Sequence, residues 1–105
     1  MKVVSINKPK GIIDGSIMLK TLKFSYNHIA SFFGEPSILR LKDMYFIEWH
    51  IEFEDGLRAS IISYFKDDLN KEEENNWMIS ADKKQSIIYD RLKKILNSKD
   101  WGVFN

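Results

Sequence analysis

The clearest pattern along the chain runs from Tyr45 to Glu54, where apolar residues occupy every second position and the residues between them are polar except for Phe46. A period of two places the two sets on opposite faces of a β-strand, with the apolar set in the core. That apolar set is Tyr45, Ile47, Trp49, Ile51 and Phe53. A second segment, Leu57 to Lys66, is rich in isoleucine and aromatic residues and follows the turn signal Asp55-Gly56. Together the two segments predict a β-hairpin.

The register of this hairpin follows from matching the faces of its strands. A two-residue Asp-Gly turn would place Phe53 opposite Arg58, so that apolar and polar residues would share a face. A three-residue loop, Glu54-Asp55-Gly56 with Gly56 in the left-handed conformation, pairs Phe53 with Leu57 instead. We predict this loop, and it sets the remaining pairs: Ile51 with Ala59, Trp49 with Ile61, Glu52 with Arg58, and Phe46 with Tyr64.

Capping residues and periodicity predict the other elements. Ser16 to Phe24 is predicted as a strand, and Ser25 as the N-cap of a short helix from Tyr26 to Phe33. Gly34 and Pro36 then end that helix, because glycine accepts a left-handed conformation and proline cannot continue a helix.

The C-terminal third is predicted to hold a short strand and a longer helix. Residues 67–76 are acidic and without periodicity, which indicates a solvated loop before a short strand from Trp77 to Ile79. Asp82 is the expected N-cap of a helix that runs to about Asn97, with Gln85 completing a capping box. The apolar face of this helix consists of Ile88, Leu92, Ile95 and Leu96.

These elements predict a single domain over residues 1–105 of the α+β class. We expect an antiparallel sheet of three to four strands, with one short helix and one longer C-terminal helix packed on the Trp49 face. The hydrophobic fraction of 44% and the charged fraction of 30% are those of a globular protein. The chain has no cysteine, which excludes disulfides, thiolate zinc sites and a cysteine nucleophile. No segment resembles a signal peptide or a membrane span, so we expect a cytoplasmic location, in the host cell if the protein is viral.

Charge is segregated along the chain although the net charge is only +1. Residues 1–42 carry +5, residues 43–76 carry −7 and residues 77–105 carry +3. Folding could bring the opposite charges together in a mixed surface, which is the usual arrangement. Alternatively, the surface is bipolar and orients an approaching partner.

The candidate chemistry is sparse. Glu48, His50 and Glu52 could ligate Zn²⁺ or Mn²⁺, but alternate residues on a strand lie about 7 Å apart. Arg58 opposite them would also repel a cation, so we predict a solvated face with a Glu52–Arg58 pair, no metal and no cofactor. Ser/His/Asp catalysis through His28 or His50 lacks any local signature, so we predict that the chain is not an enzyme.

Two surfaces are candidates for binding. Phe46, Ile62 and Tyr64 interrupt the polar face of the hairpin, so either a helix covers that end, which we favour, or an apolar patch rimmed by acids is exposed. The predicted partner-binding residues are Phe46, Glu48, His50, Glu52, Ile62 and Tyr64. The alternative is nucleic-acid binding by the basic flank of the last helix, through Lys83, Lys84, Arg91 and Lys94. A homodimer through a bare sheet edge is also open.

Five short fragments, in order, carry a resemblance to a known group of proteins. They are Asp14-Gly15-Ser16, Phe33-Gly34-Glu35-Pro36, the run from Glu48 to Gly56, Ala59-Ser60-Ile61, and Trp77-x-Ile79. Over residues 14 to 96 the chain thereby resembles a family of small uncharacterised proteins of phages and large viruses. It departs from that pattern at Ser80-Ala81, where a glycine pair is expected, and at Ile62-Ser63-Tyr64. The family supplies no catalytic residues.

The resemblance implies a viral accessory protein. With the missing catalytic chemistry and the mixed outer face, it leads us to expect stoichiometric binding to a protein partner, for example as an inhibitor of a host defence or regulatory factor.

Overall fold

Six antiparallel strands and two helices make up the part of the chain that the computed structural model describes, residues 3–6, 20–66, 69–81 and 84–98. The strands are β1 (Val3–Ile6), β2 (Thr21–Ser25), β3 (Ser37–Leu41), β4 (Met44–Phe53), β5 (Arg58–Phe65) and β6 (Glu74–Ala81). The helices are α1 (Tyr26–Phe33) and α2 (Gln85–Leu96). The α+β class is as predicted, but the sheet has more strands than the three to four expected.

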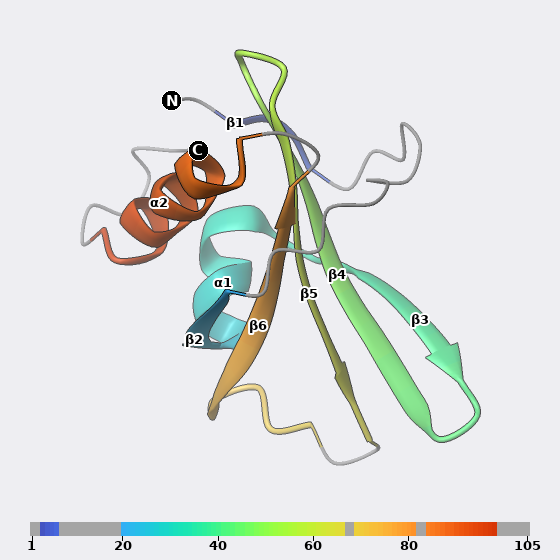
Figure 1. Ribbon diagram of the computed structural model, residues 1–105. Coiled ribbons are helices and arrows are strands. Elements are labelled where there is room, and N and C mark those ends of the chain that lie inside the picture. Colours follow the sequence, from blue (N-terminus) through green and yellow to red (C-terminus); the bar gives the residue numbers. More distant parts are fainter. Residues whose placement is uncertain (1–2, 7–19, 67–68, 82–83, 99–105) are drawn as a thin grey trace.

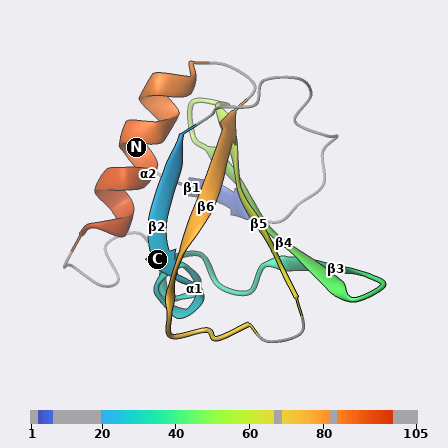
Figure 2. The ribbon, with the colours of Figure 1, turned by 60° about the horizontal axis from the view of Figure 1, so that its bottom comes forward.

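The long strand β4 organises the sheet. Five strands follow the order β1-β4-β5-β6-β2, and β3 pairs with β4 on the same edge as β1 but at the opposite end of β4. Both helices lie against one face of the sheet, so the molecule has two layers (Figure 1). The β3–β4 turn projects on the side away from the helices, as Figure 2 also shows.

The central hairpin has the predicted register. Ile51 pairs with Ala59, Trp49 with Ile61, Glu52 with Arg58 and Phe46 with Tyr64. The turn closes through the Gly56 amide donating to the Phe53 carbonyl at 2.9 Å, and Gly56 has a φ of +83°. The three-residue loop is therefore confirmed, and the alternation of faces is the reason that it could be predicted.

The prediction missed β3 and β1. Leu41 and Met44 flank a two-residue turn, Lys42-Asp43, in which Lys42 has a φ of +55°. Such turns can normally be recognised in a sequence by glycine or asparagine at the positive-φ position, and a lysine there gives no such signal. All five residues of β3 are exposed, so its sequence also lacks the alternation that reveals a half-buried strand.

Several predicted boundaries were wrong. β6 begins at Glu74, three residues before the predicted strand, because residues 74–76 pair with the end of β2 rather than staying in the acidic loop. The N-cap of α2 is Lys84, in a left-handed conformation and without a side-chain capping bond. The predicted cap Asp82 and the strand positions 16–19 lie outside the described residues.

Helix α1 has the predicted bounds. Ser25 precedes it in an extended conformation, and its hydroxyl accepts a hydrogen bond from the His28 amide at 3.0 Å. At the other end Gly34 has a φ of +78°, but its ψ of −158° is not that of a left-handed helix. Its amide still donates to the Ala30 carbonyl at 2.7 Å, so glycine ends the helix as expected.

Two tryptophans form the centre of the core. Trp49 of β4 and Trp77 of β6 are fully buried, and their rings meet edge to face with centroids 5.3 Å apart. Each indole N–H must find an acceptor once it is buried. Trp77 donates to the Phe24 carbonyl at 2.9 Å, and Trp49 donates to the Gly34 carbonyl at 2.8 Å. Because these carbonyls flank α1, the two indoles hold both ends of this helix to the sheet.

The second helix is bound to the first through a histidine. The apolar face of α2 is buried as predicted, through Ile88, Leu92, Ile95 and Leu96. His28 of α1 lies stacked on Phe24 at 5.0 Å, and its Nε2 is 2.5 Å from the carbonyl oxygen of Leu96. His28 therefore packs on Phe24 and joins α1 to the end of α2. Neither helix is long and apolar enough to cross a membrane, within the ranges that the structure describes.

Replacing the N-cap of α1 should destabilise the whole domain, because this helix covers Trp49. We expect Ser25→Ala to lower the free energy of unfolding by about 1 kcal/mol in urea denaturation, the usual cost of a lost cap. Ser25→Asp should restore most of the loss, since aspartate caps as well as serine, and Ser37→Ala on the exposed strand β3 should have little effect. Equal stability of Ser25→Ala and the parent chain would show that the cap contributes nothing.

Candidate protein-binding surface

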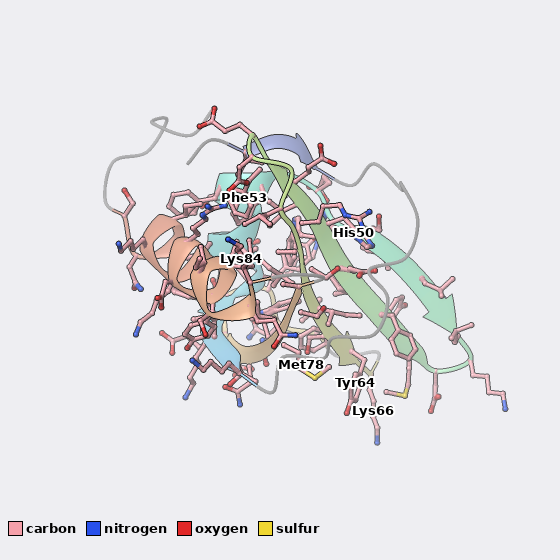
Figure 3. The ribbon with its side chains drawn as sticks, turned by 45° about the horizontal axis from the view of Figure 1, so that its top comes forward. His50, Phe53, Tyr64, Lys66, Met78 and Lys84 are labelled. Carbon is pink, nitrogen blue, oxygen red and sulfur yellow. The ribbon has the colours of Figure 1, made fainter. Side chains whose placement is uncertain are left out.

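The face of the sheet opposite the helices, the outer face, holds all six predicted partner-binding residues. Phe46, Glu48, His50 and Glu52 alternate along β4 with the buried core residues, and Ile62 and Tyr64 do so along β5. The register places Glu48 opposite Ile62 and Phe46 opposite Tyr64. Figure 3 shows Tyr64 close to one end of this face and His50 toward the other. The structure thus brings the six residues onto one continuous surface.

One end of the outer face is apolar. We call this region the outer apolar patch; it consists of Leu39, Leu41, Met44, Phe46, Ile62, Tyr64 and Met78. Leu39, Phe46 and Tyr64 form one row across three strands, in which the rings of Phe46 and Tyr64 lie 5.9 Å apart. Leu39 is 58% exposed and Tyr64 56% exposed. Exposed apolar side chains clustered in this way are typical of interaction sites.

No described helix covers this patch. The favoured prediction, that a helix lies over the Phe46 end of the hairpin, is therefore wrong for the residues that the structure describes. Both α1 and α2 are held on the opposite face, because that face carries the two tryptophans and the larger apolar side chains. The alternative prediction, an exposed patch beside acidic residues, agrees with the exposure of Tyr64.

The other end of the outer face carries a polar network. Ser60 of β5 is only 2% exposed, and its hydroxyl donates to Glu48 Oε2 at 2.8 Å. His50 Nε2 lies 3.0 Å from the same carboxylate oxygen, and His50 Nδ1 lies 3.3 Å from the Ser60 hydroxyl. Cross-strand pairing of His50 with Ser60 sets these three side chains side by side. The network satisfies a buried hydroxyl and fixes the orientation of two half-buried ionisable groups.

Two features of this network bear on the chemistry that it could support: the burial of Ser60 and the placement of the acidic groups. A nucleophilic serine must reach its substrate, whereas Ser60 is buried and directs its proton to Glu48. Among the described residues, no three His, Cys, Asp or Glu side chains are placed to hold a metal ion. Glu52 lies opposite Arg58 in the register, away from the Glu48–His50 pair.

The basic flank of α2 is only partly available to a ligand. The guanidinium of Arg91 donates to Asp55 through both nitrogens, at 3.1 and 2.7 Å, and lies over the Phe53 ring at 5.1 Å. Arg91 therefore ties α2 to the turn of the central hairpin, and its positive charge is already paired with the Asp55 carboxylate. Lys84 and Lys94 are exposed, and Lys83 lies outside the described residues. A shallow depression beside this flank is lined by Asp90, Lys93, Lys94 and Asn97, so it holds two positive charges and one negative charge.

Four members of the outer apolar patch were not predicted. Leu39 and Leu41 belong to β3, which gave no signal, and Met44 lies just before the strand predicted from Tyr45. Met78 lies within the predicted strand from Trp77 to Ile79 but was not assigned to a surface. Met78 could have been found, because it stands between the core residues Trp77 and Ile79 in a strand and must point outward.

Comparison of the chain with protein-family models, curated proteins and solved structures finds no match. The resemblance to small phage and large-virus proteins therefore stays a prediction.

The Asp55–Arg91 pair should make stability depend on pH in the acid range. Its hydrogen bonds with Arg91 hold the pKa of Asp55 below its ordinary value of 3.8. A carboxyl whose pKa is lower in the folded state adds stability that is complete above the unfolded pKa and is lost as pH falls through the folded pKa. We expect Asp55→Asn to lower the thermal midpoint at pH 7, and the difference from the parent to disappear well below pH 3.8.

The matched control is Asp43→Asn, the same change in the turn between β3 and β4. A difference between Asp55→Asn and the parent that persists unchanged at low pH would show that the aspartate charge is not the cause.

Proposed function

We propose that this chain acts by stoichiometric binding to a protein partner through the outer face of its sheet. The observation that carries the proposal is the outer apolar patch, with Leu39 and Tyr64 more than half exposed on the side that no described helix covers. Interfaces combine an apolar centre rich in aromatic residues and methionine with a polar rim. Phe46, Tyr64 and Met78 supply such a centre, and the Glu48–His50–Ser60 network borders it.

Further support comes from the rigidity of this surface. The patch lies on paired strands, and Glu48 and His50 are held by hydrogen bonds. A surface that is ordered before binding loses less conformational entropy when the partner docks. The acidic rim, with Glu48 and Glu52, favours a partner that is basic around an apolar centre.

The resemblance to phage and large-virus proteins extends the proposal to the cellular location and to the kind of partner. It suggests an accessory protein in the cytoplasm of an infected cell, where a host defence or regulatory factor would be the partner. Nucleic-acid binding stays the alternative prediction, but only Lys84 and Lys94 of its described residues are exposed, and Arg91 is paired with Asp55.

The test is loss of a partner upon substitution of the patch. We expect the double variant Ile62→Asp/Tyr64→Ala to reduce capture of the partner by the tagged chain at least about tenfold, because aromatic residues at the centre of an interface carry much of its binding energy. Capture would be measured from lysates of the native or infected host and then with the purified partner, at defined stoichiometry. A milder variant, Tyr64→Ser/Met78→Ser, changes only exposed side chains and protects the test against misfolding.

The matched control is Ile87→Asp, which introduces the same charge at an exposed apolar position of α2. It should bind as the parent does, and circular dichroism should show all variants folded. Undiminished capture by both folded patch variants would rule out the outer face as the binding surface.

A further inference from the structure

Strand β3 has a strand neighbour on one side only. It pairs with β4 through all five of its residues, and no other described strand lies beyond it. Each of its residues is exposed, and Figures 1 and 2 place it away from both helices. Native sheets usually protect such edges by a bulge, by inward-pointing charges or by proline within the strand. β3 has a continuous register with β4 and no internal proline; its one charged residue, Arg40, lies over the Tyr45 ring, and among the described residues no strand pairs with its other edge.

The turn determines which backbone groups face the open edge. Residues that flank a two-residue hairpin turn form a hydrogen-bonded pair, and such pairs alternate along the ladder. Leu41 pairs with Met44 beside the turn, so Leu41 and Leu39 direct their backbone groups toward β4. The N–H and C=O groups of Ile38 and Arg40 therefore point toward the open edge.

We propose that the chain forms a symmetric homodimer in which β3 of one copy pairs antiparallel with β3 of a second copy, with Leu39 on the two-fold axis. Ile38 of each copy then forms a hydrogen-bonded pair with Arg40 of the other, so all outward backbone groups of these residues meet complementary groups. Only backbone atoms of Arg40 take part; its side chain stays over the Tyr45 ring, at 5.2 Å.

This register fits a second copy in three ways. It is self-complementary, as a two-fold contact requires, because position 38 meets position 40 in both directions. It joins the outer apolar patches, since the row of Leu39, Phe46 and Tyr64 continues into the same row of the second copy. It also brings Lys42 of each copy level with Pro36 of the other, one residue from Glu35, so opposite charges lie at both ends of the contact.

The contact is small. Stable protein interfaces bury roughly 1,200–2,000 Å² in total, and two five-residue strands with their exposed side chains bury less. The dimer should therefore depend on concentration. This inference does not rest on the proposed partner, because it uses the edge of β3 and needs only the purified chain.

The first measurement is the mass of the purified chain in sedimentation experiments over a wide concentration range. We expect the average mass to rise from 12.4 kDa toward twice that value as concentration increases. A mass that stays at 12.4 kDa up to about millimolar concentration would overturn the proposal. A chain that stays monomeric would not contradict the proposed binding of a protein partner. Likewise, failure to capture a partner would not contradict the homodimer.

A charge exchange tests the register. Leu39→Lys and Leu39→Glu should each be monomeric, because two like charges meet on the two-fold axis, and an equimolar mixture should dimerise again. Ile87→Lys and Ile87→Glu, the matched changes on α2, should dimerise as the parent does. Retained dimerisation of both single Leu39 variants, or no recovery in the mixture, would contradict the proposed pairing.

A cysteine cross-link tests the same point without charge, and the natural chain contains no cysteine to interfere. Facing residues of a non-hydrogen-bonded antiparallel pair lie about 4.5 Å apart, within the range of about 4.4–6.8 Å that a disulfide spans. Leu39→Cys should therefore form a disulfide-linked dimer under mild oxidation at least about tenfold faster than Leu41→Cys or Tyr64→Cys, which lie farther from the axis. Equal or faster cross-linking of either control would place the contact elsewhere and refute this one.

Discussion

The paired tryptophans are the interaction on which the rest of the structure depends. Trp49 and Trp77 come from strands that flank β5, and together they fill the centre of the helical face of the sheet. Their indole N–H groups donate to the chain immediately before and after α1, at Phe24 and Gly34. A buried donor without an acceptor is costly, so this requirement fixes both the position of α1 and the face that it covers. His28 of α1 then places the end of α2.

Both helices pack on the face of the sheet that carries the two tryptophans, so no described helix covers the outer face. A two-layer domain has one buried sheet face, and the second face is normally polar. Here the polar character holds only at one end, where Glu48, His50 and Ser60 bond to one another. At the other end the apolar residues continue from β3 to β6. The patch is therefore a departure from the simple pattern, and such departures are where function is expected.

The charged groups show how segregation along the chain is resolved in space. Arg91, from the basic C-terminal third, pairs with Asp55 of the acidic middle third and also covers Phe53. This contact agrees with a mixed surface rather than a bipolar one. It also explains why the sequence alone overestimates the positive charge that α2 offers to a ligand. Arg91, counted in the basic flank, is paired with Asp55 in a turn 36 positions away.

Local rules determined a large part of this protein from the sequence alone. Alternation of faces was enough for the register of the central hairpin, and the cap at Ser25 and the stop at Gly34 were enough for α1. Only the tertiary structure decided that β1 and β3 share one edge of β4, that Arg91 binds Asp55, and that Ser60 is buried beneath Glu48. Period and capping depend on neighbours a few residues apart, whereas these contacts depend on which distant segments the buried tryptophans bring together.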